Sequence, residues 1–184
     1  DTAVAPLLEP LSVAVHAVIE RVPVRSGDVV VVIGAGPIGI LCAILALAAG
    51  ASRVMVTGVA SDRTRLQLAR DIGAIPVNID DEDPLVALRR LQADGADIVY
   101  ETSGVASTLE QAIAMARRGG SIGLIGLCHG ASTFKSTPIV LKEVALIGSR
   151  GYNETTWTLM MTVLPQVVSQ VLRLVTHEVA YSDF

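Results

Sequence analysis

Three glycines with the spacing G-x-G-x-x-G, namely Gly34, Gly36 and Gly39, lie in the segment IGAGPIG. Where such a motif joins a strand to the following helix, it forms a tight turn, leaves room for a pyrophosphate and lets the helix pack closely on the strand. Pro37 suits the first helical turn, where its missing N–H costs no hydrogen bond. The free N–H groups and the positive end of the helix dipole attract phosphate there. The motif predicts a dinucleotide site, with a tight turn that binds no ligand as the alternative.

The segments around this motif alternate between short apolar runs and helical patterns. The apolar runs are nearly continuous, which is typical of parallel strands buried on both faces. We expect strands at residues 29–33, 53–57, 74–78, 97–101, 121–127 and 144–149. We expect helices at residues 37–49, 62–72, 84–93, 105–117 and 136–143, with flanking helices at 7–22 and 153–173. This order predicts an α/β fold, a doubly wound six-stranded parallel sheet (Rossmann fold) with N- and C-terminal flanking helices.

Local signals mark the ends of several of these helices. Ser61 and Asp62 are suited to cap the helix after the second strand. Asp83 and Pro84 suit the N-cap and the first position of the next helix. Gly119 suits the end of the fourth helix, because it follows two arginines that complement the helix dipole.

Composition and charge bear on the class of partner. The chain has 184 residues, is 51% hydrophobic and carries a formal net charge of −4. Nonspecific nucleic-acid binding needs a basic face, so we expect no nucleic-acid partner. Residues 29–52 carry no charge and are long enough for a membrane span. Glycines and Pro37 interrupt this run, and it has no basic flank or aromatic belt, so we expect a strand and a helix and no membrane partner.

The two cysteines, Cys42 and Cys128, lie far apart in apolar surroundings, without Cys-x-x-Cys spacing. This arrangement favours two free thiols in a reducing compartment. The chain opens with Asp1 and Thr2, without the basic start and apolar core of a signal peptide. We therefore expect a cytoplasmic protein.

The segment GDVVVVIGAGPIGILCAILALAAGASRVMVT resembles the cofactor-binding domain of the zinc-dependent medium-chain alcohol and polyol dehydrogenases, above all the sorbitol and threonine dehydrogenase branch. Further motifs agree in order along the chain: EPLSVAVHAV (9–18), DIGA (71–74), ETSG (101–104), GLIGL (123–127) and LIGSRGY (146–152). The resemblance implies an NAD(P)-dependent enzyme that transfers hydride between nicotinamide and a secondary alcohol or ketone. Two alternatives stay open: a zinc-free NADPH-dependent quinone or enone reductase, and a non-catalytic dinucleotide-binding protein.

In this family a separate N-terminal domain supplies most ligands of the catalytic zinc. The resemblance implies that residues 1–25 are the crossing helix from that domain, and that residues 26–184 are the dinucleotide-binding domain of a longer enzyme. Ser182 and Asp183 resemble the cap of a further helix. We expect zinc in the full-length enzyme but none in this fragment. The fragment is expected to contain no catalytic residue, to bind dinucleotide and to turn nothing over.

The resemblance also assigns cofactor contacts position by position. Five residues match the pyrophosphate loop: Gly34, Gly36, Pro37, Ile38 and Gly39. Three match the loop after the fourth strand, beside the cofactor: Thr102, Ser103 and Gly104. Gly126 and Leu127 match the turn near the nicotinamide end. Glu9 matches a carboxylate at or near the zinc of the polyol branch, although a Glu at a helix start also serves as a dipole or capping residue.

The tip of the second strand bears on the choice between NAD and NADP. NAD-specific members place an acid there to bind the ribose hydroxyls, whereas this chain has Gly58. The longer segment that follows holds Ser61, Arg63 and Arg65, which suit a 2′-phosphate. These residues favour NADP. Asp62 replaces the missing acid if the segment folds back, and a helix cap with solvated arginines is a further alternative.

Other residues bear on substrate and assembly. Polyol dehydrogenases carry an Arg-Tyr pair where this chain has Gly151 before Tyr152, which weakens the case for a polyol substrate. His16 lies among small apolar residues, and we expect it to be packed or capped. Family members associate through the sheet edge near the sixth strand, so we expect a homodimer or homotetramer. Apolar residues of the last helix supply either such a face or part of the core: Trp157, Leu159, Met160 and Met161.

Overall fold

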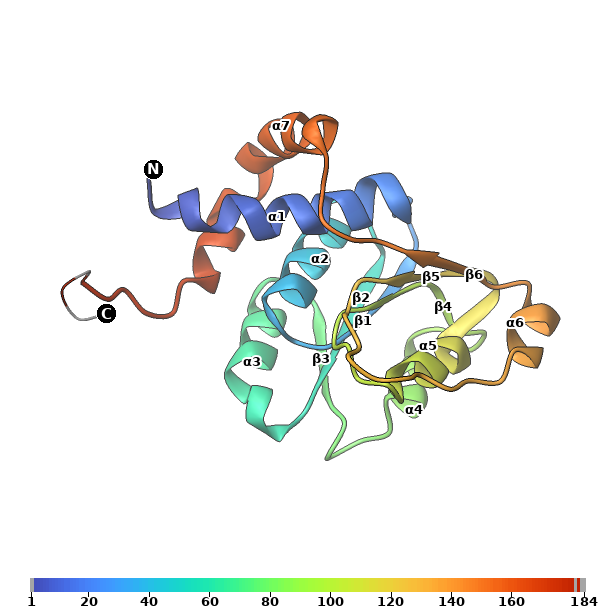
Figure 1. Ribbon diagram of the computed structural model, residues 1–184. Helices are drawn as coiled ribbons and strands as arrows, with labels where there is room; N and C mark the ends of the chain where they lie inside the picture. The colour runs from blue at the N-terminus through green and yellow to red at the C-terminus, as the bar shows by residue number, and fades with distance from the viewer. Residues whose placement is uncertain (1, 181, 183–184) are drawn as a thin grey trace.

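The computed structural model describes residues 2–180 and residue 182, which form a six-stranded sheet covered by helices on both faces (Figure 1). The strands are β1 (Val29–Ile33), β2 (Arg53–Gly58), β3 (Ile75–Asn78), β4 (Ala96–Glu101), β5 (Ala116–Leu124) and β6 (Ala145–Gly148). They lie in the order β3-β2-β1-β4-β5-β6, and each pairing is parallel. The order reverses between β1 and β4, which is the switch point of a doubly wound sheet. The predicted fold class is confirmed.

Two groups of helices cover the sheet. The first group packs on one face and comprises α1 (Leu8–Val15), α2 (Pro37–Ala48), α3 (Arg63–Asp71) and α7 (Glu154–Val171). The second group packs on the other face and comprises α4 (Pro84–Leu91), α5 (Thr108–Met115) and α6 (Thr137–Lys142). Short 3₁₀ segments lie at η1 (Thr2–Leu7), η3 (Ala60–Asp62) and η4 (Leu172–Leu174), and a π-helical turn, η2 (His16–Arg21), continues α1.

The central strand β1 explains the uncharged run in the sequence. Val30 and Val32 face the core formed with α1 and α2, whereas Val31 and Ile33 face the core formed with α4 and α5. Because side chains alternate along a strand, both faces need apolar residues, and every residue of β1 is buried. The α2 helix is also buried over residues 39–46. The run is therefore a strand and a helix, as expected.

The N-terminal helical stretch crosses the face of the fold that α2 and α7 also cover (Figure 1). By length and composition alone, Ala3–Arg21 would be long and apolar enough to cross a membrane. In the fold, Leu11, Val15 and Val18 of this stretch are fully buried in the core shared with α2 and α7. Burial in the core therefore accounts for the apolar character of these three residues.

Several predicted boundaries are confirmed and others are wrong. Asp83 caps α4, since its carboxylate accepts hydrogen bonds from the N–H groups of the first turn. Gly119 does not end a helix: α5 ends at Met115, and residues 116–124 form β5. The cause is tertiary, because the guanidinium of Arg117 binds the carboxylate of Asp97 in β4, with Nε and Oδ1 2.6 Å apart. Strand β5 also ends earlier than predicted, so residues 125–127 form a loop.

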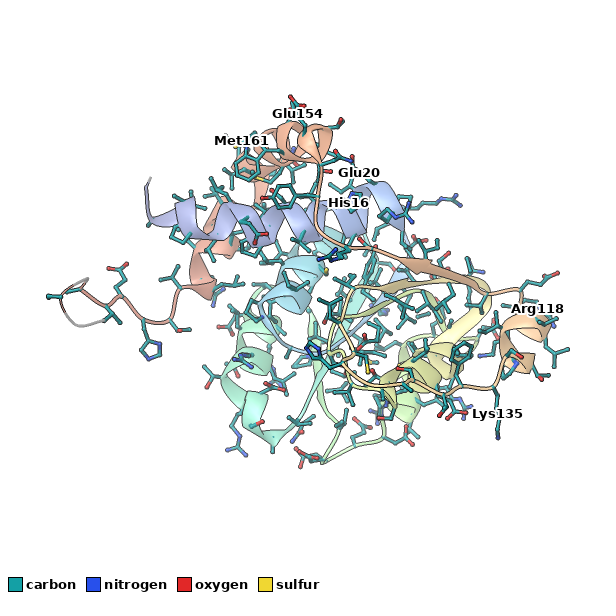
Figure 2. All side chains as sticks on the ribbon, in the orientation of Figure 1. His16, Glu20, Arg118, Lys135, Glu154 and Met161 are labelled. Carbon is teal, nitrogen blue, oxygen red and sulfur yellow. The ribbon has the colours of Figure 1, made fainter. Side chains whose placement is uncertain are left out.

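The last helix is only partly in the core. Met160 is fully buried, whereas Trp157 and Met161 are exposed to 38% and 49%. Glu154 and Met161 lie on the outer side of α7 (Figure 2). Pro165 lies inside α7 without ending it. Asp183, half of the helix cap expected near the C-terminus, lies outside the described residues.

Candidate functional site

The glycine motif forms the turn between β1 and α2, as the sequence predicts. Gly34 has φ +106°, a conformation that favours glycine. A Cβ placed on Gly34 would lie 3.0 Å from Oγ1 of Thr102, and a Cβ on Gly39 would lie 2.0 Å from the carbonyl oxygen of Gly34. These two glycines are therefore required by close packing. A Cβ on Gly36 would meet nothing within 4 Å, so the protein leaves space at this position.

The start of α2 is suited to bind an anion in the space beside Gly36. Gly36 is the N-cap residue and has no side chain to accept hydrogen bonds from the first turn. Pro37 occupies the first helical position, and the first turn holds no acidic residue. The first N–H groups of a helix lack partners within the helix and carry the positive end of its dipole. The α2 helix thus presents positive charge where a phosphate would lie.

The loop after β4 packs against this turn. Thr102 donates from Oγ1 to the carbonyl oxygens of Ile33 and Gly34, at 2.9 and 3.1 Å. Gly104 has φ +68°, and a Cβ on it would lie 2.6 Å from the carbonyl oxygen of Leu127. The loops after β1, β4 and β5 therefore meet at the carboxyl edge of the sheet, where ligands of doubly wound folds bind.

Glu101, at the end of β4, holds two of these loops together and is only 4% exposed. Its Oε1 accepts hydrogen bonds from the backbone N of Ser103 at 2.8 Å, the backbone N of Gly104 at 3.1 Å and Oγ1 of Thr108 at 3.0 Å. Its Oε2 would lie 2.5 Å from a Cβ placed on Gly126, so the carboxylate also packs against the loop after β5. Burying a carboxylate costs free energy unless its oxygens accept hydrogen bonds, and here N–H and hydroxyl groups supply these bonds. Glu101 therefore fixes the loop geometry.

Glu101 is a site residue that the sequence pattern did not predict. The motif ETSG assigned Thr102, Ser103 and Gly104 to the site but gave no role to the acid that precedes them. The available signal was an ionisable residue at the end of an otherwise apolar strand, followed by small residues whose N–H groups can turn back toward it.

A groove runs from this edge toward α1 and the segment after β6, and we call it the switch-point groove. Its volume is about 670 Å³. The predicted residues that line it are Glu9, Ile38, Thr102, Gly126 and Leu127. The other lining residues are Val13, Ile125, Ser149, Arg150, Gly151 and Tyr152. The structure thus brings Ile38 of the glycine turn, residues of the loops after β4 and β5, and Glu9 to one cavity.

At the tip of β2, a carboxylate occupies the space that Gly58 was expected to leave without an acid. A Cβ on Gly58 would lie 3.2 Å from the Cβ of Ala35 and 3.2 Å from Oδ2 of Asp62. Asp62 makes no capping hydrogen bond to α3 and instead folds back to the strand tip. Arg65 pairs with this carboxylate, with Nη1 and Oδ1 2.9 Å apart. Arg63 lines a separate hollow between α3 and the end of β3.

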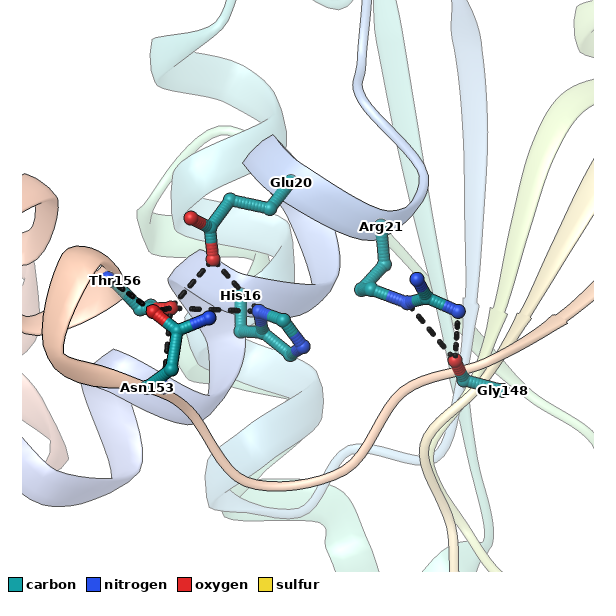
Figure 3. A network of polar contacts seen from close by, with 6 residues as sticks. All are labelled: His16, Glu20, Arg21, Gly148, Asn153 and Thr156. Carbon is teal, nitrogen blue, oxygen red and sulfur yellow. Dashed lines mark hydrogen bonds and ion pairs between the residues drawn. The ribbon is translucent and has the colours of Figure 1, made fainter.

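A polar network joins η2, which continues α1, to the start of α7 (Figure 3). Oε2 of Glu20 lies 2.7 Å from Nδ1 of His16 and accepts a hydrogen bond from Oγ1 of Thr156. The hydrogen bonds from His16 and then Thr156 lower the pKa of Glu20 below its ordinary value. Arg21 donates to the carbonyl oxygen of Gly148 at the end of β6. The expectation that His16 is packed or capped is confirmed, and the network ties the N-terminal helical stretch to the start of α7.

The described residues do not supply a metal site. No group of three or more His, Cys, Asp or Glu side chains that could hold a metal ion occurs among residues 2–180 and 182. Glu9 lines the groove without a second side chain of these types there. Zinc sites take three or four protein ligands, so the residues of this chain do not fit a zinc ion by themselves.

Comparison with known proteins agrees with this geometry. A family model described as "Zinc-binding dehydrogenase" matches residues 37–166. The chain is 33% identical to sorbitol dehydrogenase from Halalkalibacterium halodurans, over 100% of this chain and 54% of that protein. It is 35% identical to L-threonine 3-dehydrogenase from Bacillus subtilis, over 100% of this chain and 53% of that protein. The chain therefore spans about half the length of the curated relatives it matches.

Solved structures give the same result for the fold. An alcohol dehydrogenase from Thermotoga maritima superposes with a TM-score of 0.88 at 26% identity, covering 95% of this chain and 50% of that one. A zinc-binding dehydrogenase from Sinorhizobium meliloti, solved bound to NADP, superposes with a TM-score of 0.79 at 27% identity, covering 88% of this chain and 48% of that one.

Proposed function

Because the chain belongs to the zinc-binding dehydrogenase family, we propose that it is the NAD(P)-binding domain of an enzyme that transfers hydride between nicotinamide and a secondary alcohol or ketone. The cofactor class fits both the family and the structure's open helix N-terminus. In this proposal residues 26–184 bind the dinucleotide and residues 1–25 cross to the domain that completes the enzyme. The chain itself is proposed to bind cofactor and to catalyse nothing alone.

The observation that carries the proposal is the contrast between the glycines of the turn. Two of them, Gly34 and Gly39, are forced by protein packing, whereas Gly36 borders empty space at an uncapped helix start. A tight turn without a ligand would explain the first two glycines but not the third. A pyrophosphate explains the space at Gly36, because it must approach the backbone closely.

The positions of the loops give each predicted residue a role. The pyrophosphate would lie against Gly36 and the first turn of α2, near Ile38. The nicotinamide would reach the switch-point groove beside Thr102, Gly126 and Leu127. Glu101 would act through Ser103 and Gly104 by holding their loop in place. The chain's contribution to hydride transfer is thus to orient the cofactor and to shape one wall of the substrate cavity.

Zinc belongs to the family, but no step through zinc follows from the residues of this chain. Glu9 is proposed as a carboxylate that faces the metal from this domain, with the other ligands supplied from outside the described residues. The substrate remains broad in this proposal. Gly151 stands where polyol dehydrogenases carry Arg, and Tyr152 is exposed in the groove wall, so we propose a secondary alcohol or ketone without specifying a polyol.

The choice between NAD and NADP depends on the tip of β2. Gly58, Ser61 and Arg63 favoured NADP on the sequence, and the Sinorhizobium meliloti neighbour was solved with NADP. In this chain, however, the carboxylate of Asp62 lies at the strand tip, so a preference for NADP does not follow from Gly58 alone.

The zinc-free quinone or enone reductase is not favoured, because the relatives are named as alcohol, sorbitol and threonine dehydrogenases. A cytoplasmic location and a homodimer or homotetramer remain proposals. The exposed Trp157 and Met161 support an apolar face on α7, whereas Met160 serves the core.

A thermal unfolding series tests the proposed function. A ligand that binds only the folded state stabilises it, so the unfolding midpoint rises with the logarithm of ligand concentration over the dissociation constant. Saturating NADH or NADPH should raise the midpoint, whereas S-adenosylmethionine, which shares the adenosine but lacks the pyrophosphate, should not. Failure of both dinucleotides to change the midpoint would contradict the proposal.

A further inference from the structure

The β2 strand ends at a residue with no side chain, but a carboxylate occupies the place beside it. After Gly58 the chain forms the 3₁₀ turn η3, which returns Asp62 to the strand tip. A Cβ on Gly58 would lie 3.2 Å from both Cβ and Oδ2 of Asp62. The backbone N of Val59 donates to the same Oδ2 at 3.2 Å. Asp62 therefore fills the space that the side chain of an acid at position 58 would enter.

This carboxylate lies next to the dinucleotide turn. The same Cβ on Gly58 would also lie 3.2 Å from the Cβ of Ala35, the residue between the first two glycines of the motif. A dinucleotide that places its pyrophosphate at Gly36 carries its adenosine ribose toward the end of the neighbouring strand β2. Asp62 is the acid that this ribose would meet.

The carboxylate retains capacity for a further hydrogen bond. One oxygen, Oδ1, accepts from Nη1 of Arg65 at 2.9 Å, and Oδ2 accepts from Val59. A carboxylate offers about four lone-pair sites, so roughly two remain for hydroxyl donors. These two hydrogen bonds fix the position of the side chain, and its exposure of 19% leaves part of the carboxylate accessible to a ligand.

We propose that Asp62 accepts a hydrogen bond from the 2′-hydroxyl of the adenosine ribose and makes this domain select NADH over NADPH. The inference rests on the proposed dinucleotide function and reverses the preference that Gly58 predicts on the sequence. Asp62 supplies from four positions later the acid that the strand tip lacks.

The charges around the strand tip act against a 2′-phosphate. A phosphate dianion would lie beside the Asp62 carboxylate, which repels it. The guanidinium of Arg65 is already paired with Asp62. Arg63 lines a hollow that Val59, Ala60 and the carboxylate residues Asp81 and Glu82 also line. On the other side of η3, the carboxylate of Asp80 accepts a hydrogen bond from the backbone N of Ala60 at 2.7 Å. One of the two arginines that suited a 2′-phosphate, Arg65, is thus already paired with a carboxylate.

Binding of NADH and NADPH to the 184-residue chain, measured by calorimetry, tests the proposal. The wild-type chain should bind NADH at least about tenfold more tightly than NADPH, as expected for one repelled charge at a partly buried site. Asp62→Asn removes that charge and releases Arg65, so the ratio of the two dissociation constants should fall to about one or reverse. Asp71→Asn is the matched control, because it removes one charge at the other end of α3, where Asp71 pairs with Arg173.

The possible outcomes distinguish the role of Asp62 from dinucleotide binding itself. Equal or tighter binding of NADPH to the wild-type chain overturns the role of Asp62 and leaves the dinucleotide site intact. The same holds for a folded Asp62→Asn variant whose ratio is unchanged, or for an Asp71→Asn variant whose ratio changes as much. Binding of neither nucleotide overturns the dinucleotide function and this inference together. The wild-type ratio needs no variant, so a folding defect in Asp62→Asn does not remove the test.

Discussion

The α-carbon of Gly39 packs directly against the carbonyl oxygen of Gly34, so that a Cβ on Gly39 would approach this oxygen to 2.0 Å. No rotation of the added methyl can relieve such a contact, because both atoms belong to the backbone framework. The first turn of α2 therefore packs so closely on the end of β1 that only glycine fits at both contact positions. Protein packing does not require a glycine at position 36, because a Cβ there would contact nothing within 4 Å.

This contrast predicts losses of stability of very different size for substitutions at the two glycines. Gly39→Ala should lower the free energy of unfolding by about 3 kcal/mol, near the upper end of ordinary overpacking penalties. Gly36→Val should lower it by less than about 1 kcal/mol, because its backbone is extended and its Cβ meets nothing within 4 Å. Urea denaturation of the two variants checks this difference. Equal losses of stability would contradict the described packing.

The buried carboxylate of Glu101 should be required for the cofactor loops. Glu101→Ala leaves the N–H groups of Ser103 and Gly104 without their acceptor, which should cost about 1–3 kcal/mol. Amide hydrogen exchange at these two residues should accelerate, and the affinity for NADH should fall. Glu110→Ala on the exposed face of α5 is the control. Unchanged exchange in Glu101→Ala would show that the carboxylate does not hold the loop.

The Glu20 network should stabilise the packing of α1 and η2 against α7 in a pH-dependent way. Its hydrogen bonds lower the pKa of Glu20 from the ordinary value of 4.5, so folding favours the ionised form. This contribution is present above pH 4.5 and is lost as the pH falls through the lowered pKa of the folded state. The stability difference between wild type and Glu20→Gln should therefore shrink below pH 4.5. A difference that grows on acidification would contradict this sign.

Thr102 should contribute to the same edge through its hydroxyl. Thr102→Val keeps the shape of the side chain but removes the donor to the carbonyl oxygens of Ile33 and Gly34. The free energy of unfolding should fall by about 1–2 kcal/mol, the usual effect of losing a hydrogen bond to a partly buried acceptor. Thermal denaturation measures this change. Thr162→Val, at an exposed position of α7, should be nearly neutral.

The parts of the fold that local pattern and packing determine together could be predicted from the sequence. The β1 strand and α2 were identifiable because their apolar runs reflect burial and because the glycines mark the turn between them. The end of α5 could not be identified, since Arg117, Arg118 and Gly119 resemble a helix C-terminus. The pairing of Arg117 with Asp97 draws this segment into β5 instead. Tertiary contact overrides the local signal there.

The candidate site divides in the same way. The glycine turn, Thr102, Gly126 and Leu127 could be assigned to the carboxyl edge of the sheet because each follows a strand. Glu9, in contrast, could be assigned only through the family resemblance. The position of Asp62 depends on whether three residues form a 3₁₀ turn, and a sequence pattern does not specify that closure. The role of Glu101 was not predicted because its main partners are backbone N–H groups, which are present at almost every residue and therefore give no specific sequence signal.

Calorimetric titration of the 184-residue chain and its Gly36→Val variant with NADH tests the central claim most directly. The wild-type chain should bind one NADH saturably. The variant should remain folded and bind at least about 100-fold more weakly, because the valine fills the space of charge-assisted hydrogen bonds worth about 1.5–3 kcal/mol each. Absence of NADH binding to the wild-type chain, or equal binding to the variant, would contradict the assignment of this turn as the cofactor site.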